Sequence, residues 1–176
     1  TINRSGVNVR LGNQTVGNLN VDRVETIDST VVGNTIRGPN STNYWIVNGT
    51  NSGSVSGSAS NPPADANVAF SGFGEINGGT GVDNFSISAA YVGTINGGDG
   101  VDTFNISSTL PATVNGGNGN DIFNISTGAT ITGSLNGEAG DDTFNISANV
   151  TAPGALNGGD GNDTFNADVS GLSIST

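Results

Sequence analysis

The chain has 176 residues, of which 29 are glycine, 33% are hydrophobic and only 11% are charged. Fifteen acidic and four basic side chains, with no histidine, give a net charge of −11 at pH 7. This charge argues against nucleic acid as a partner. The lack of cysteine excludes a disulfide framework, and no apolar run is long enough to predict membrane insertion.

The basic residues lie at one end of the chain. All four are arginines within residues 1–37, whereas residues 38–176 carry twelve acidic side chains and no basic one. Such a segment repels itself unless cations neutralise it. The charge distribution therefore predicts that the longer segment binds cations.

Residues 1–75 contain weak copies of a nine-residue phrase, GGxGxDxUx (U is a large apolar residue), that becomes regular further along the chain. Residues 7–11 alternate as a strand does. The stretch VDRVETID from Val21 parallels FSGFGEIN from Phe70. The stretch STVVGNTIR aligns with the phrase and puts Asn34 at the Asp place and Ile36 at the large apolar place.

A clearer weak copy is GPNSTNYWIV from Gly38, in which Asn43 takes the Asp place and Trp45 the large apolar place. Asparagine offers a neutral oxygen, so this turn is expected to keep its shape without binding a metal ion tightly. Residues 61–65 (NPPAD) predict a loop that interrupts the coils. We predict one domain over residues 1–176, with degenerate coils in 1–75 and five regular coils in 76–176.

Five regular copies of the phrase fill residues 76–176, beginning at Gly78, Gly97, Gly116, Gly137 and Gly158. Their phenylalanines are separated by 19, 19, 21 and 21 residues and are Phe85, Phe104, Phe123, Phe144 and Phe165. A fixed period of about 20 residues is typical of a stacked solenoid, because one repeat cannot bury its own apolar face.

Each phrase is followed by a strand-like alternation. Phe104 and Ile106 are predicted to point inward, while Thr103, Asn105 and Ser107 point outward. A second inward ladder precedes the turns and consists of Ile76, Ile95, Val114, Leu135 and Leu156. We therefore predict an all-β, right-handed parallel β-solenoid with about 20 residues per coil. The outward column Asn105, Asn124, Asn145 and Asn166 is either an amide ladder or a solvated surface.

One carboxylate recurs at a fixed place in each coil, and stacking the coils stacks these carboxylates into a column that needs a cation. The column consists of Asp83, Asp102, Asp121, Asp142 and Asp163. The alternative interpretation is a turn without metal, since Gly, Asn and Asp are ordinary turn residues.

The phrase resembles the nonapeptide of the RTX, or hemolysin-type, calcium-binding repeats. Four copies match at every fixed position, and the copy at Gly137 departs with Glu138. RTX nonapeptides run in direct tandem, whereas here one copy occurs per coil. The resemblance therefore implies calcium turns along one flank only.

Calcium takes six to eight oxygen ligands, and the glycines allow turn carbonyls to curl toward one point. Five turns would form four sites between coils, each bridged by the aspartates of successive turns, from Asp83/Asp102 to Asp142/Asp163. The predicted additional ligands are the carbonyls near Gly79, Gly81, Gly98, Gly100, Gly117, Gly119, Gly140, Gly159 and Gly161.

The stretches VDRVETI, GPNSTNYWIVNGTNSGSVSG and FSGFGEINGG resemble repeat modules of large bacterial surface adhesins, including filamentous-hemagglutinin-like proteins. This resemblance implies a calcium-stabilised structural segment of an extracellular adhesin or filament at the bacterial cell surface. Because neither end carries an evident cap, further coils or other copies of the chain are expected to stack end to end.

Two other function classes remain open. One is a ligand-binding calcium solenoid, although the residues beside the turns form an array too irregular for ice. Tyr44, Trp45 and Tyr91 could contact a glycan, but Trp45 has the phase of the core. The other class is an accessory module of a secreted enzyme that acts on polysaccharides. Catalysis by this chain itself is not expected, because His, Lys and Cys are missing.

Overall fold

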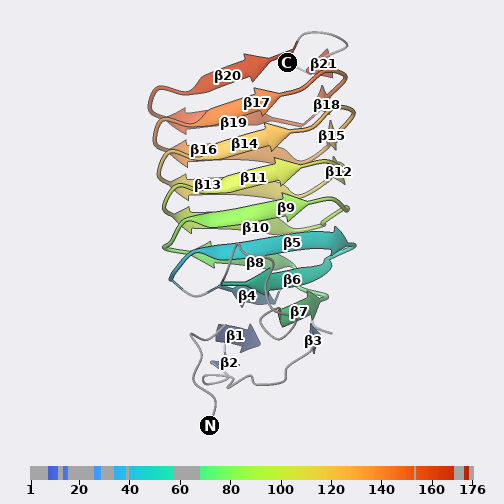
Figure 1. The fold of residues 1–176 in the computed structure, drawn as a ribbon, viewed down its shortest axis with the longest axis vertical. Coiled ribbons are helices and arrows are strands. Elements are labelled where there is room, and N and C mark those ends of the chain that lie inside the picture. The colour runs from blue at the N-terminus through green and yellow to red at the C-terminus, as the bar shows by residue number, and fades with distance from the viewer. Residues whose placement is uncertain are drawn as a thin grey trace.

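The computed structural model describes residues 34–38, 40–57, 68–152 and 154–168 in full, and the backbone of four short strands at 8–11, 14–15, 26–28 and 173–174. These residues form three sheets and no helix. The strands stack in layers from the N-terminus at one end to β20 at the other (Figure 1).

Sheet A consists, in spatial order, of β19 (Leu156–Asp160), β16 (Ser134–Ala139), β13 (Thr113–Asn118), β10 (Thr94–Asp99), β8 (Glu75–Gly79), β4 (Thr35–Arg37), β1 (Asn8–Leu11) and β2 (Gln14–Thr15). Sheet B consists of β20 (Thr164–Ala167), β17 (Thr143–Ile146), β14 (Ile122–Ile125), β11 (Thr103–Ile106), β9 (Asp83–Ile87), β5 (Asn43–Gly49), β6 (Ser52–Ser56), β7 (Val68–Ser71) and β3 (Thr26–Asp28). The small sheet C consists of β12 (Thr109–Leu110), β15 (Thr130–Ile131), β18 (Thr151–Ala152) and β21 (Ser173–Ile174).

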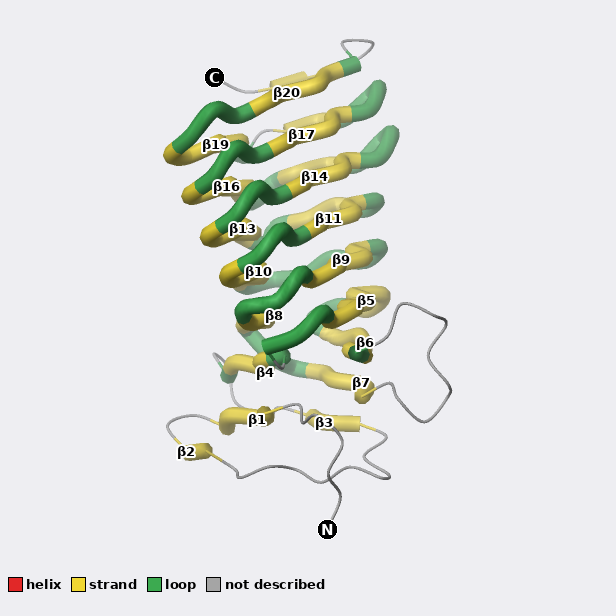
Figure 2. The backbone as a smooth tube through the Cα atoms, turned by 60° about the vertical axis from the view of Figure 1, so that its left-hand side comes forward, coloured by secondary structure: helices red, strands yellow, loops and turns green. Residues whose placement is uncertain are grey.

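Successive coils pair in parallel and in register. Phe104 lies opposite Phe85 on one side and Phe123 on the other, and Ile95 lies between Ile76 and Val114. Each coil advances by one 19- or 21-residue repeat, and the glycine-rich turns that link sheet A to sheet B stack along one edge (Figure 2). The prediction of an all-β parallel solenoid is confirmed.

The core lies between sheets A and B and consists of side-chain ladders. The phenylalanine rings from Phe85 to Phe165 stack with centroids 4.5–4.8 Å apart and planes within 14° of parallel. The predicted inward ladder of sheet A is buried from Ile76 to Leu135, and Leu156 is partly buried. Both predicted ladders are therefore confirmed, and each coil depends on its neighbours for burial.

The predicted repeat extends one coil toward the N-terminus. Asn43 pairs with Asp83, Trp45 with Phe85 and Ile36 with Ile76, all in parallel. Residues 34–49 thus form a coil of the same kind, which we call the first coil. The alignment of Gly38–Val47 is confirmed.

Beyond the first coil, the prediction of degenerate coils is wrong for the described residues 52–57 and 68–71. Strand β6 runs antiparallel to both β5 and β7 and covers the edge of β5, whereas β7 pairs in parallel with β3 on its other side; Val55 and Phe70 are buried. Alternation with a period of two residues is common to parallel and antiparallel strands and did not reveal the reversal. This β6–β7 pair, which we call the capping hairpin, covers the first coil within sheet B, although the sequence shows no evident cap; the loop predicted at 61–65 lies outside the described residues.

Two other N-terminal alignments are corrected. Ile36 belongs to the ladder of Ile76 in sheet A, not to the phenylalanine ladder, and Asn34 precedes that strand rather than taking the Asp place. The alignment of the stretch from Val21 with the stretch from Phe70 makes Ile27 equivalent to Ile76. In the structure Ile27 pairs with Phe70 instead, so this alignment does not match equivalent places in the coil.

The outward asparagines form hydrogen-bonded ladders. On sheet B, Asn124 Nδ2 donates to Asn105 Oδ1 at 3.0 Å, and Asn145 and Asn166 continue the series at 2.8 and 2.9 Å. Of the two interpretations of this column, the amide ladder is confirmed. Its side-chain bonds add to the backbone bonds that keep the coils in register.

Candidate functional site: a buried aspartate column

The predicted carboxylates form a column just inside the turns that link sheets A and B. The aspartate that ends each turn faces the interior, and Asp83, Asp102, Asp121 and Asp142 are at most 1% exposed. The fifth, Asp163 in the last coil, is partly exposed. The structure therefore brings all five predicted residues into one column and buries four of them.

One oxygen of each carboxylate is satisfied by the preceding coil. The backbone N–H of Asp83 donates to Asp102 Oδ1 at 2.7 Å, and that of Asp102 donates to Asp121 Oδ1 at 2.8 Å. The two following pairs repeat this bond at 2.7 and 3.0 Å, up to Asp163 Oδ1. These bonds explain why an acceptor is needed at this place in every coil.

The other oxygen has no hydrogen-bond partner. The Oδ2 atoms of Asp83, Asp102, Asp121 and Asp142 are all buried without a donor. A buried polar atom without a partner costs about 1–3 kcal/mol, and more if it is charged. Because four such atoms occur at the same place in successive coils, they are a regular feature of the fold rather than a local defect.

The first glycine of each phrase shows what these oxygens face. A Cβ at Gly97 would collide with Asp102 Oδ2 and approach the carbonyl oxygen of Gly116 in the next coil at 2.6 Å. The same two kinds of oxygen meet beside Gly78, Gly116 and Gly137. Glycine is required here because any side chain would fill the space where the two acceptors converge.

Burial makes these carboxylates hard to ionise. It raises the pKa of Asp102 and of Asp121 to about 7, against the opposing effect of the N–H bonds they accept. The charges of neighbouring acids raise both pKa values further, including that of Glu138 in the case of Asp121. Burial also raises the pKa of Asp83 to about 6 and that of Asp142.

Asn43 provides an internal comparison, because it takes the place of the aspartate in the first coil. Its Nδ2 atom lies 3.2 Å from the Gly78 carbonyl oxygen and 2.7 Å from both Ser41 O and Asp83 Oδ1. An amide donor therefore fills the position at which an Asp coil has an oxygen. A carboxylate there faces acceptors without a hydrogen between them and needs a proton or a cation.

The comparison also bears on the predicted carbonyl ligands. Ser41, whose carbonyl faces the Asn43 amide, is equivalent to Gly81 and Gly100 in the next coils, so the predicted carbonyls at this place lie near the column. The carbonyls of Gly79 and Gly98 instead face the equivalent glycine of the following coil within sheet A. The sequence analysis missed the first-glycine carbonyls of Gly97, Gly116, Gly137 and Gly158, whose signal was the invariance of that glycine in all five copies.

The donor set fits a hard, oxygen-seeking cation. It combines one unpartnered carboxylate oxygen with a facing carbonyl, which are ligand types that calcium prefers, and the carboxylate of the next coil is bonded to the backbone N–H of the same aspartate. No cluster of three or more His, Cys, Asp or Glu side chains occurs in the described part of the chain, so backbone carbonyls would have to complete the shell. Residues that suit a softer metal are absent from the column.

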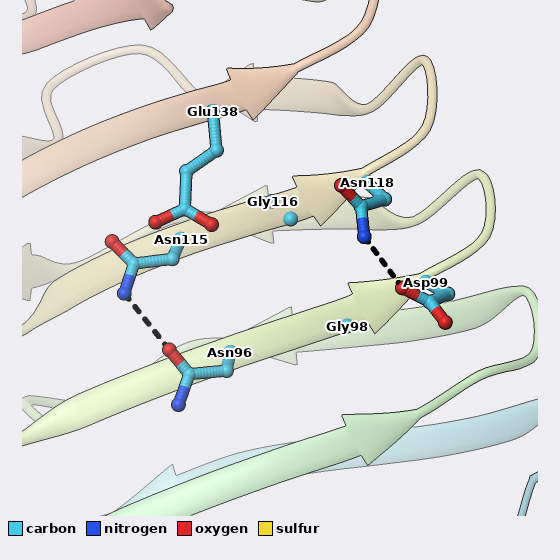
Figure 3. A pocket seen from close by; sticks show the side chains of 8 residues that line it. Asn96, Gly98, Asp99, Asn115, Gly116, Asn118 and Glu138 are labelled. Atoms are coloured by element: carbon cyan, nitrogen blue, oxygen red, sulfur yellow. Dashed lines mark hydrogen bonds between the residues drawn. The ribbon is translucent and has the colours of Figure 1, made fainter.

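A second feature is a polar groove on the outer face of sheet A, with a volume of about 250 Å³ (Figure 3). Its floor includes Gly98 and Gly117, which lack side chains. One wall is an amide ladder in which Asn115 Nδ2 donates to Asn96 Oδ1 at 2.8 Å. The other wall contains Asn118, whose Nδ2 donates to Asp99 Oδ1 at 2.8 Å.

Glu138 overhangs this groove from the next coil and extends toward Asn115 (Figure 3). It is in register with Gly117 and Gly159 but has a side chain, and its φ of 76° lies in the left-handed region. A non-glycine residue in that region costs about 1–3 kcal/mol and is found more often at functional sites. Glu138 is thus the one strained side chain in a column that otherwise contains glycine.

Comparison of the chain with known families, curated proteins and solved structures gives no match. Among the described residues, no helix is long and apolar enough to cross a membrane.

Proposed function

We propose that the chain is a rigid, extended structural segment whose stiffness depends on calcium ions bound between its coils, as in the RTX-like repeats that the turns resemble. The observation that carries this proposal is the facing pair of acceptors in four coils, an unpartnered aspartate Oδ2 and a glycine carbonyl. A cation turns each repulsive pair into a bridge between coils.

The charge of the chain supports the same proposal. Residues 38–176 contain twelve acidic side chains and no basic one, and four of the acidic side chains are buried in one column. Protons compete with calcium for the column, because the raised pKa values near 7 leave part of it neutral at physiological pH. Calcium affinity should therefore increase with pH.

We propose an extracellular location at a bacterial cell surface, as the resemblance implies, and the kind of site supports a location outside the cell. Each coil contributes one carboxylate and backbone carbonyls, and sites of low ligand charge bind calcium weakly. Calcium-binding modules outside cells work with dissociation constants of about 0.1–1 mM. A solenoid of this kind suits the shaft of an adhesin or filament, and the proposal assigns no reaction to the chain.

The open face of the last described coil supports stacking against another coil. Phe165 packs on Phe144 at 4.6 Å but is 47% exposed, and β20 has no neighbour on its outer edge among the described strands. A further coil with the same Asp-x-Phe pattern, from a longer chain or another copy, would continue every ladder.

Thermal unfolding tests the structural role. The midpoint should be much higher in calcium than in EDTA, with magnesium giving little protection because it requires a smaller octahedral shell. Equal midpoints in calcium and EDTA would exclude calcium as the stabilising ion.

A second function, binding of an uncharged hydroxyl-rich ligand such as a saccharide, is favoured by the groove of sheet A. Amides can both donate to and accept from hydroxyl groups, and Glu138 adds a strong acceptor. The lack of basic residues beside the groove disfavours anionic polymers. Titration of neutral oligosaccharides by NMR should shift the amide signals of Asn96 and Asn115; unchanged spectra would exclude this function.

A further inference from the structure

We infer that Asn43 is a built-in substitute for a cation, so that the first coil folds without metal and the aspartate coils become ordered on it in sequence from the N-terminal side. This inference rests on the proposed function, since it assigns the metal dependence of individual coils. It identifies residue 43 as the boundary between a metal-independent and a metal-dependent part of one continuous solenoid.

The first step of the argument is the bonding of Asn43 itself. Its backbone N–H and its side-chain Nδ2 both lie 2.7 Å from Asp83 Oδ1, and Nδ2 also reaches the Gly78 carbonyl at 3.2 Å. The contact between the first coil and the next therefore contains a neutral side-chain donor that faces both the Gly78 carbonyl and the Asp83 carboxyl. Every later contact between coils has the same N–H bond but lacks the side-chain donor.

The second step is that the cradle is the same in both kinds of coil. A Cβ at Gly38 would approach Gly78 O at 2.6 Å and Asn43 Nδ2 at 2.9 Å. A Cβ at Gly97 would meet Gly116 O and Asp102 Oδ2 in the corresponding arrangement. Asparagine and aspartate are nearly isosteric, so the difference lies in chemistry rather than shape: a donor replaces an acceptor at one point.

The third step is that the first coil has a source of stability that the other coils lack. Its Trp45 is buried between Phe85, stacked at 5.9 Å, and Phe70 of the capping hairpin, in an edge contact at 5.9 Å. Asn51, in the turn between β5 and β6, accepts from Val92 N and donates to Val92 O, both at 2.7 Å. The cap thus ties the first coil to the next without any charged group.

These features predict how the chain behaves without calcium. Residues 34–56 and 68–79 should keep slow amide exchange in EDTA, while protection decreases through the aspartate coils. Added calcium should order the coils outward from β9 to β20, because each carboxylate Oδ1 needs the N–H of a coil already in place. The single tryptophan, Trp45, reports on the first coil by fluorescence.

The test is hydrogen exchange and tryptophan fluorescence of the full chain and of Asn43→Asp, each in EDTA and in calcium, with bound calcium measured in parallel. In EDTA, the amide-exchange protection factors of residues 34–49 should be at least about tenfold lower in Asn43→Asp than in the wild type. A tenfold change corresponds to a shift of one unit in the pKa of the buried carboxyl. In calcium it should regain that protection and bind one more ion than the wild type.

Asp83→Asn is the matched reverse variant. It should extend the metal-independent part by one coil, through residue 87, and bind one ion fewer. The inference is overturned if both variants leave the exchange pattern and the stoichiometry unchanged, or if residues 34–49 of the wild type lose protection in EDTA together with the aspartate coils. A wild type that binds no calcium would instead refute the proposed function, so the two failures are distinguishable.

Discussion

Replacing Asp102 with asparagine should stabilise the metal-free protein, which is the reverse of the usual effect of changing a proposed metal ligand. Burial raises the pKa of Asp102 from 3.8 to about 7. Each pKa unit corresponds to about 1.4 kcal/mol, so ionising this carboxyl in the folded protein costs up to about 4 kcal/mol at pH values above 7. Asp102→Asn removes that cost, keeps the acceptor for Asp83 N–H and adds an amide donor toward the Gly116 carbonyl.

The assay is urea unfolding in EDTA at about pH 8 and about pH 4, two pH values between which the Asp102 carboxyl of the folded protein changes charge. Asp102→Asn should exceed the wild type by about 2–4 kcal/mol at the higher pH and by less than about 1 kcal/mol at the lower pH, where the carboxyl is already neutral. Asp102→Ala is the control, because it also removes the charge but leaves Asp83 N–H without an acceptor. It should be less stable than Asp102→Asn by about 1–3 kcal/mol at both pH values. If Asp102→Asn gains nothing in EDTA at the higher pH, the column carries no uncompensated buried charge.

Three further predictions follow from the same structure. In EDTA the wild type should be most stable near pH 4 and should lose stability as the pH rises through about 7. The reason is that the folded state holds protons on Asp102 and Asp121 that the unfolded chain has already released. A urea midpoint that rises with pH over this range would contradict the raised pKa values. Glu138→Gly should raise the melting temperature in EDTA, by an amount equivalent to about 1 kcal/mol, because it relieves the left-handed φ of 76°; a lower melting temperature would mean that the Glu138 side chain stabilises the coil more than its backbone strains it. Phe123→Ala should lower the free energy of unfolding by about 3–5 kcal/mol, because the ring is buried and stacked on both sides. Phe165→Ala should lower it by less than about 1 kcal/mol, because that ring is half-exposed and stacked on one side. Similar losses in the two variants would argue against the open last coil.

The regular half of the fold could be predicted because two independent periods agree. The spacing of the phenylalanines gives the coil length, and the alternation after each turn gives the inward face. Phe104 and Ile106 could therefore be assigned to the core from the sequence alone. The same reasoning failed for Ile36, because one apolar residue without regular neighbours fits either ladder. It also failed for β6 and β7, since strand direction leaves no mark on a two-residue alternation.

The candidate site was predictable in its charged part and not in its neutral part. The aspartates recur at one place and were found by counting, whereas the carbonyls of Gly97 and Gly116 belong to the backbone and have no residue signature. The role of Asn43 could not be predicted from the sequence, in which it is simply a neutral residue at the place of the aspartate. Only the contact of its Nδ2 with the Gly78 carbonyl shows that an amide donor lies where the later coils have an unpartnered carboxylate oxygen.

The most direct test of the account is the number of calcium ions bound per chain, measured by equilibrium dialysis at about pH 8 and about 10 mM calcium, which is about tenfold or more above the dissociation constants of extracellular sites. The wild type should bind four ions, one for each unpartnered Oδ2 of Asp83, Asp102, Asp121 and Asp142. The variant with all four changed to asparagine should bind none of these four ions and should remain folded in EDTA. The account is contradicted if the wild type binds no calcium, or if the fourfold asparagine variant binds as many ions as the wild type.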